Sequence, residues 1–203
     1  MKKFKKIFLV DNFDSFTFNL VDYFRQLECE VEVYRNTVDP KKVDAVKPDL
    51  LVFSPGPSIP KNAGNMMKII DQYHDKYPMF GVCLGHEAFV EYFGGSLKFV
   101  TPVHGKSTEM HHDGKTIFSG IEQDFMGGRY HSLCADKVPD DFEVSATTAM
   151  AGSSTSDGLV MAMRHKTLPI ESVQFHPESV LTMKRGNGFR IIENIVNGKY
   201  ANY

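Results

Sequence analysis

The stretch that decides the fold is Pro78-Met79-Phe80-Gly81-Val82-Cys83-Leu84-Gly85-His86. Its first half is a short apolar run that predicts a buried strand, and the residues after it follow a helical pattern. Between them, Gly81-x-Cys83-x-Gly85 has the spacing of a nucleophile elbow, a sharp turn whose two glycines let the backbone fold tightly and present one reactive side chain. In this sequence that side chain is a thiol.

The position of Cys83 favours nucleophilic chemistry. A cysteine at a helix N-terminus feels the partial positive charge of unpaired N–H groups, which favours the thiolate, and the thiolate is the nucleophile. The same pattern also fits a strand with one buried cysteine. A cysteine nucleophile needs a base, a group that orients the base, and donors for an oxyanion, so the prediction depends on finding them elsewhere in the chain.

Composition and charge are those of an ordinary globular chain. Its 203 residues are 42% apolar and 24% charged, so the chain is long and apolar enough to bury the core of a single domain over 1–203. A net charge of -2 gives no reason to expect nucleic acid or an anionic membrane as a partner. The apolar run at 7–10 is too short for a signal peptide, which predicts a cytoplasmic protein. The odd number of cysteines agrees with a reducing compartment, and Cys29 and Cys134 are interpreted as packing residues.

The chain on either side of the elbow predicts an α/β fold. Apolar runs at 7–10 and 50–53 predict buried strands, and the alternation of charged and apolar residues at 29–34 predicts a strand nearer the sheet edge. Apolar residues recur at helical spacing at 20–27, 66–73, 88–93 and 189–196. Alternating strands and helices indicate a mostly parallel sheet with helices on both faces. From 96 to 175 the texture changes to strands and hairpins, with short runs at 97–100, 116–118, 142–146 and 159–164 and a polar turn at 152–158.

The segment Gln174-Phe175-His176-Pro177-Glu178-Ser179 offers the base and its orienting group. Pro177 favours an extended conformation for His176, and residues two apart in extended chain project to the same side, so Glu178 can lie beside the imidazole. A carboxylate there raises the pKa of the histidine, which suits a group that holds a proton near a thiolate. Without an elbow elsewhere, the same segment would indicate only a strand end with an ion pair.

Backbone donors for an oxyanion are expected from two turns. The N–H of Leu84, the residue after the nucleophile, is one. Gly56 in Ser54-Pro55-Gly56-Pro57 follows a predicted parallel strand at the same sheet edge and is the other. The spacings of His104, His111, His112 and His131 match no usual metal site, so no metal is predicted and packing is the interpretation.

Several motifs together resemble a known family. Gly-Val-Cys-Leu-Gly-His at 81–86 and Gln-Phe-His-Pro-Glu-Ser at 174–179 resemble the triad of class I glutamine amidotransferases. The opening Asp-Asn-Phe-Asp-Ser-Phe-Thr at 11–17 is similar to that of the small subunits of anthranilate synthase and aminodeoxychorismate synthase. Ser-Pro-Gly-Pro at 54–57, His-Gly-Lys at 104–106 and Arg-Tyr-His-Ser-Leu at 129–133 match in order and spacing. The resemblance covers essentially the whole chain.

This resemblance implies a flavodoxin-like glutaminase in which Cys83 attacks the side-chain amide of L-glutamine. It implies that His176, oriented by Glu178, protonates the departing ammonia and then activates water on the thioester. The positions implied for glutamine and oxyanion binding are Gly56, Pro57, Ser58, Leu84, Glu87, Ser132 and Leu133. It also implies a synthase partner that uses chorismate and magnesium; this chain shows no site for either, and no cofactor of its own is expected.

Two residues depart from the family pattern. Glu87 replaces a glutamine expected to contact substrate, and Ser58 replaces a glycine. An ionised Glu87 cannot donate a hydrogen bond and would oppose thiolate formation nearby. Losing one buried hydrogen bond is worth about 1–3 kcal/mol, enough to slow turnover without abolishing it. Ser58 is expected to shift the loop that carries Gly56.

Three alternatives to an anthranilate synthase subunit stay open. Ser179-Val180-Leu181-Thr182 is slightly more like the anthranilate branch than the aminodeoxychorismate (para-aminobenzoate, folate) branch, and some relatives serve both. Glu87 motivates a regulatory subunit with impaired glutaminase activity. A partner-free γ-glutamyl hydrolase of the same fold is disfavoured by the motif at 11–17.

Overall fold

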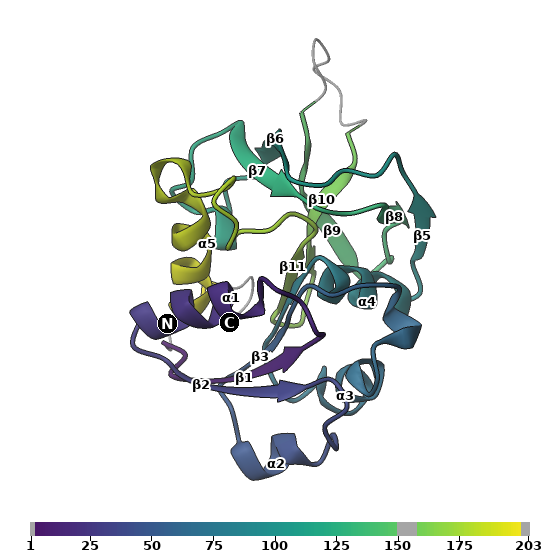
Figure 1. Cartoon of the computed structure of the whole chain (residues 1–203), viewed down its shortest axis with the longest axis vertical. Coiled ribbons are helices and arrows are strands. Elements are labelled where there is room, and N and C mark those ends of the chain that lie inside the picture. Colours follow the sequence, from purple (N-terminus) through teal and green to yellow (C-terminus); the bar gives the residue numbers. More distant parts are fainter. Residues whose placement is uncertain (1–2, 150–157, 200–203) are drawn as a thin grey trace.

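A nine-stranded sheet runs through the molecule in the order β2-β1-β3-β4-β11-β10-β9-β6-β7 (Figure 1). The structure is a computed structural model that describes residues 3–149 and 158–199. The strands are β1 (Lys6–Asp11), β2 (Glu30–Arg35), β3 (Leu50–Phe53), β4 (Met79–Val82), β6 (Lys106–His112), β7 (Phe125–Arg129), β9 (Phe142–Thr148), β10 (Val160–His165) and β11 (Ile170–Val173). A separate pair is formed by β5 (Ser96–Phe99) and β8 (Leu133–Lys137).

The first half of the sheet is parallel, as the apolar runs predict. β2, β1, β3, β4 and β11 all run in the same direction. Every residue of β3, β4 and β11 is buried, whereas β2 at the edge is exposed or half-buried, in keeping with its charged alternating sequence. The expected α/β class with a parallel sheet is therefore confirmed.

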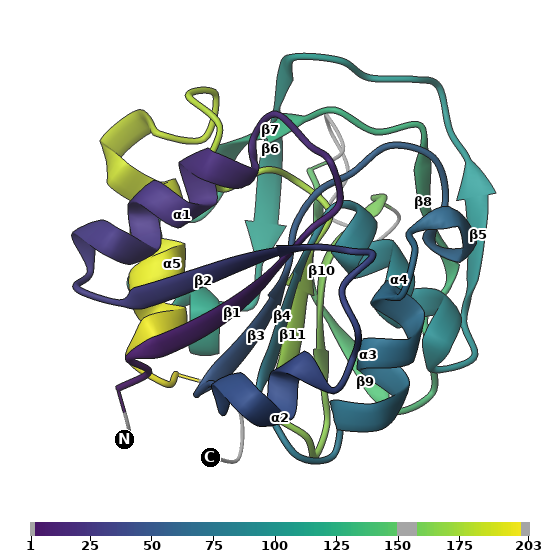
Figure 2. The same ribbon diagram turned by 60° about the horizontal axis from the view of Figure 1, so that its bottom comes forward.

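Helices cover both faces of this parallel half (Figure 2). Helices α1 (Thr17–Gln26) and α5 (Asn187–Val196) lie on one face, and α2 (Lys42–Val46), α3 (Met66–Tyr73) and α4 (Leu84–Tyr92) lie on the other. Side chains alternate along β1, so that Ile7 and Leu9 belong to the core beneath α1 and α5 while Phe8 and Val10 belong to the core beneath α3 and α4. The two cores hold the layers together.

The second half of the sheet is antiparallel and departs in part from the sequence prediction. Strands β5, β9 and β10 confirm the runs at 97–100, 142–146 and 159–164. The run at 116–118 was predicted as a strand, which is wrong: Thr116–Phe118 is the 3-10 helix η2, with Ile117 and Phe118 packed in the core. The predicted polar turn at 152–158 lies outside the described residues except for Gly158.

Two further short 3-10 helices are η1 (Pro60–Asn62), which follows the loop at 54–58, and η3 (Lys184–Gly186), which follows the segment at 174–179. The helices within 3–149 and 158–199 are all too short or too polar to cross a membrane.

Candidate active site

The turn between β4 and α4 has the geometry of a nucleophile elbow. Cys83 adopts φ 53° and ψ -101°, a backbone conformation that L residues rarely adopt. A Cβ on Gly81 would lie 2.6 Å from the carbonyl carbon of Gly85, and a Cβ on Gly85 would lie 2.5 Å from the backbone oxygen of Phe53. Both glycines are therefore required by close packing, which leaves Cys83 as the side chain presented at the turn.

The register between β4 and β11 brings the distant histidine segment to Cys83. Val82 pairs with Val173, and the Cys83 N–H donates to the Val173 carbonyl oxygen at 2.8 Å. The chain then continues directly into the 174–179 segment. There the N–H of His176 donates to the Gly128 carbonyl oxygen at 2.9 Å, and the Thr182 hydroxyl donates to the His176 carbonyl oxygen at 2.6 Å. These bonds hold the His176 backbone beside the elbow.

His176 and Glu178 form a buried pair next to the thiol. The His176 Nδ1 lies 2.6 Å from Glu178 Oε1, and both residues are 2% exposed. Since Nδ1 is engaged by the carboxylate, Nε2 is left, and it is buried without a hydrogen-bond partner among the described residues. Burial lowers the pKa of His176, but Glu178 and Cys83 together outweigh it and hold the pKa well above its ordinary value of 6.5. The structure thus places beside the sulfur an imidazole whose affinity for a proton is raised.

Burial of the Cys83 thiol works against the thiolate. The helix N-terminus was expected to favour the thiolate, yet burial of the thiol raises the pKa of Cys83 above its ordinary value of 9.0. His176 is the group that lowers this pKa, while Glu87 and Glu178 raise it further. Among the side chains around the thiol, His176 is the one that favours the thiolate.

The loop after β3 lies against the residue that follows Cys83. A Cβ on Gly56 would lie 2.5 Å from Asn12 Cβ and 2.7 Å from Leu84 Cδ2, so only glycine permits this approach. The N–H of Asn12 donates to Ser54 Oγ, and its side-chain amide donates to the Ser54 carbonyl oxygen, both at 2.9 Å. Gly56 and Leu84, the two predicted oxyanion donors, are thus neighbours.

Pro57 and Ser58 are exposed on the same loop. Ser58 has φ 70°, a left-handed conformation that favours glycine, and its hydroxyl accepts a hydrogen bond from Asn62 Nδ2 at 2.9 Å. The serine therefore keeps the glycine-like backbone instead of moving to a conformation that serine prefers.

Glu87 lies inside the site and is joined to the nucleophile by Gln174. Gln174 Nε2 donates to Glu87 Oε1 at 2.9 Å and lies 3.8 Å from Cys83 Sγ. Glu87 is 3% exposed, and this burial raises its pKa to about 7 although Gln174 lowers it. The sequence alone led us to expect an ionised Glu87; in the structure a large share of it is protonated at neutral pH.

Ser132 and Leu133 stand at the start of β8, and a histidine holds them in place. Ser132 is exposed and Leu133 is buried. His131 Nδ1 donates to the Leu133 carbonyl oxygen at 2.7 Å, and its Nε2 accepts from Arg129 Nε at 2.9 Å. Burial and Arg129 lower the pKa of His131 to about 4, so it is neutral. The sequence interpretation of His131 as a packing residue missed this role, for which the Arg-Tyr-His-Ser-Leu motif was the available signal.

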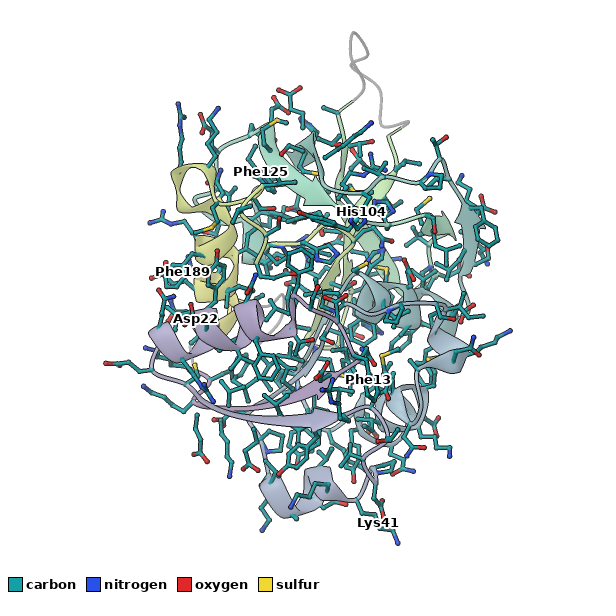
Figure 3. All side chains as sticks on the ribbon, in the orientation of Figure 1. Phe13, Asp22, Lys41, His104, Phe125 and Phe189 are labelled. Atoms are coloured by element: carbon teal, nitrogen blue, oxygen red, sulfur yellow. The ribbon has the colours of Figure 1, made fainter. Side chains whose placement is uncertain are left out.

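Aromatic rings cover His176. The Tyr130 ring centroid lies 4.9 Å and the Phe16 centroid 5.2 Å from that of His176. Phe16 belongs to the loop after β1, which gives the opening motif a place in the site. Figure 3 labels Phe13, on the loop after β1, and His104, on the segment between β5 and β6.

The other histidines of the sequence analysis have separate partners. His104 packs against Tyr130, His111 pairs with Asp124, and His112 contacts the backbone of Glu122. Across 3–149 and 158–199, no group of three or more His, Cys, Asp or Glu side chains is arranged to hold a metal ion. Cys29 and Cys134 are buried and free of disulfides.

The chain is similar to known proteins in both sequence and fold. The profile of the glutamine amidotransferase class-I family matches residues 8–194. Anthranilate synthase component II of Haloarcula marismortui is 48% identical, with 95% of this chain and 92% of that protein covered. Aminodeoxychorismate/anthranilate synthase component 2 of Bacillus subtilis is 43% identical, with 87% and 89% covered. A solved structure of a candidate GMP synthase subunit from Thermoplasma acidophilum superposes with a TM-score of 0.82 at 27% identity, covering 98% of this chain and 95% of that one. The chain therefore belongs to the class-I glutamine amidotransferase family.

Proposed function

We propose that this chain, acting as one domain over 1–203, is the glutaminase subunit of anthranilate synthase. In this proposal it hydrolyses L-glutamine and passes ammonia to a synthase subunit that uses chorismate. The observation that carries the proposal is the burial of Cys83, His176 and Glu178 at a strained elbow, where His176 is held by Glu178 and interacts electrostatically with Cys83. The names of the relatives, anthranilate synthase component II or 2, support the choice of pathway.

Each residue of the triad has one task. Cys83 gives its proton to His176, and the sulfur attacks the side-chain carbonyl carbon of glutamine. The C–N bond breaks as His176 returns the proton to the departing nitrogen, which leaves as ammonia. The remaining glutamyl thioester is hydrolysed by a water that His176 deprotonates, and glutamate leaves. Glu178 fixes the Nδ1 tautomer throughout and stabilises the imidazolium.

Backbone groups around the triad bind the substrate. The N–H groups of Leu84 and Gly56 hold the oxyanion, because the two residues lie against each other at the elbow. The glutamine head group rests on the backbone of Ser132 and Leu133, which His131 pins. The remaining substrate contacts come from Pro57 and Ser58 on the loop after β3, and from Glu87 in the first turn of α4.

The partner is a chorismate-using synthase subunit that carries magnesium, and the pair works in the cytoplasm. Relatives named as a second component support the existence of a first. Large apolar side chains are exposed on segments next to the site: Phe13 and Phe18 after β1, and Val180 and Met183 after the triad. Such side chains suit a protein interface.

The Bacillus relative, named for both pathways, supports a second candidate function, the glutaminase subunit of aminodeoxychorismate synthase. Co-purification of the native chain and identification of the product made from chorismate distinguishes the two. Anthranilate supports the first, and aminodeoxychorismate overturns it in favour of the second.

Glutamate release by the chain with and without its cognate synthase subunit tests the glutaminase proposal. We expect release in the complex, and we expect Cys83→Ser to lower glutamine-dependent product formation at least about a thousandfold while ammonia-dependent formation persists. Equal loss of both would show that Cys83 is not the nucleophile. A complex that forms without any glutamate release would instead indicate a regulatory subunit, and release without the partner a free-standing hydrolase.

A further inference from the structure

Glu87, which stands where the resemblance implies a glutamine, lies in the first turn of α4 after the nucleophile. Glu87 sits one turn into α4, and its backbone N–H donates to the Cys83 carbonyl oxygen at 3.0 Å. Its carboxyl group is 3% exposed and accepts from Gln174 Nε2. A carboxyl group has almost the shape of the amide it replaces, but it donates a hydrogen bond only when protonated.

Gln174 connects this carboxyl to the sulfur. Its side chain is fully buried, and Nε2 carries two hydrogens, one of which serves Glu87 at 2.9 Å while the other lies on the side of Cys83 Sγ at 3.8 Å. The Gln174 Oε1 is buried without a hydrogen-bond partner in the described part of the chain. Gln174 Nε2 therefore joins the Glu87 carboxyl to the Cys83 sulfur, so that a change of charge on Glu87 acts on both.

The charged and titratable groups around Glu87 oppose a second negative charge. Glu91 lies one turn further along α4, and one of its carboxylate oxygens is itself buried and unpartnered within the described residues. Cys83 from the elbow and Cys134 from β8 are both groups whose ionisation Glu87 disfavours. His176 lowers the pKa of Glu87, but its Nδ1 is already bound by Glu178.

We propose that Glu87 and Gln174 form a proton-sensitive positioning pair, in which a neutral Glu87 leaves Cys83 reactive and an ionised Glu87 suppresses it. When it is protonated, the Glu87 carboxyl can donate a hydrogen bond, as a glutamine amide at this position can. Gln174 Nε2 is then free to donate to the Cys83 thiolate. The anion removes that donor, draws Gln174 toward itself and places a negative charge beside the nascent thiolate. The proposal rests on the proposed glutaminase function and adds to it a loss of activity above neutral pH that a glutamine at this position does not produce.

The test compares wild type with Glu87→Gln as complexes with the cognate synthase subunit. We measure kcat/KM for glutamine by glutamate release between pH 6 and pH 9 and take the ratio of variant to wild type at each pH, which cancels the titration of Cys83 and His176. A group that titrates near pH 7 makes this ratio rise about tenfold from pH 6 to pH 8. Glu91→Gln should move the midpoint to lower pH, because Glu91 raises the pKa of Glu87.

Glu30→Gln on the edge strand β2 is the matched control, and its ratio to wild type should be flat. A flat ratio for Glu87→Gln as well, with both proteins active, would overturn the pair while leaving the glutaminase function intact. If glutamate is not released at all, the function fails and the pair is judged by the rate at which iodoacetamide alkylates Cys83. Alkylation that is faster in Glu87→Gln than in wild type only above pH 7 supports the pair, and equal rates throughout refute it.

Discussion

Two buried polar clusters sit in the same sheet and differ in how completely their hydrogen bonds are satisfied. In the Arg164 cluster, Arg164 is 1% exposed and all three guanidinium nitrogens have partners: Nε donates to Glu143, one terminal nitrogen to Thr116 and the other to Asp113. In the triad cluster, defined as Cys83, Glu87, Gln174, His176 and Glu178, buried acceptors or donors of Gln174, His176 and Glu178 lack partners within the described chain.

The difference separates a structural role from a chemical one. A fully paired buried ion contributes to a unique fold and has nothing left to offer a ligand. Buried groups without partners are costly to the folded state, and they persist where a substrate is to bind them. The two clusters lie close together, since Arg164 pairs across the sheet with Glu171 while the site begins after Val173. Substitutions in the triad cluster should therefore lower activity, and substitutions in the nearby Arg164 cluster should lower stability.

The largest effect is expected from Glu178→Gln, which keeps the shape of the side chain and removes its charge. Without the carboxylate the pKa of His176 falls and the imidazole is no longer held in the Nδ1–H tautomer. Glutamine-dependent turnover should fall about a thousandfold, and the free energy of unfolding should change far less than in the Arg164 variant below. Steady-state kinetics and urea melts measure both; turnover close to wild type would remove Glu178 from the triad.

Arg164→Met should give the converse result. The variant leaves Asp113 and Glu143 without their cation, and because both carboxylates are partly exposed they regain some hydration. We expect a loss of about 2–4 kcal/mol in unfolding free energy, with turnover per folded molecule unchanged within about twofold. If the variant is fully folded under the assay conditions and yet loses activity, the Arg164 cluster supports the chemistry.

Glu87→Gln sharpens the comparison through the pH dependence of stability. Burial raises the pKa of Glu87 from 4.5 to about 7, so below pH 4.5 both folded and unfolded chains hold the proton and the carboxyl costs nothing. Between pH 4.5 and 7 only the unfolded chain loses this proton, so the free energy of unfolding of wild type decreases relative to that of the variant. The difference reaches about 2–4 kcal/mol near pH 7 and stays constant at higher pH. Urea melts from pH 4 to pH 8 measure the gap, and a gap independent of pH contradicts the assignment.

The smallest effect is expected at the loop beside the elbow. Ser58 holds φ 70°, which costs a serine more than a glycine. Ser58→Gly should raise the free energy of unfolding by up to about 1 kcal/mol, reduced by the loss of the hydrogen bond to Asn62. Thermal melts test this, and a clear destabilisation would mean that the Ser58 hydroxyl, rather than the backbone conformation, matters for the loop.

The parallel half of the fold could be predicted because its strands are apolar runs buried on both faces, as in residues 50–53 and 79–82. The antiparallel half was harder. β6 (Lys106–His112) is mostly exposed and polar, β7 (Phe125–Arg129) contains a Gly-Gly pair typical of turns, and the apolar residues at 116–118 pack as a helical turn. Local pattern does not reveal strands whose pairing comes from distant segments.

The candidate triad was predictable for a similar reason, since elbow spacing and the His-Pro-Glu segment are local. The contacts of Gln174 with Glu87 and of His131 with Leu133 were not predicted. They depend on the register of β4 against β11 and on where β8 begins, which no local pattern specifies. The protonation of Glu87 follows from its burial, which is set by those same distant contacts.

Covalent labelling of the complex tests the central claim, that Cys83 is the nucleophile of a glutaminase triad, most directly. A diazoketone analogue of glutamine is incubated with the native complex, and the modified peptide is located by mass spectrometry. We predict one adduct on Cys83, none on Cys29 or Cys134, protection by glutamine, and strongly slowed labelling in Glu178→Gln. Glutamate release from a complex whose adduct lies elsewhere, or which forms none, would contradict the account.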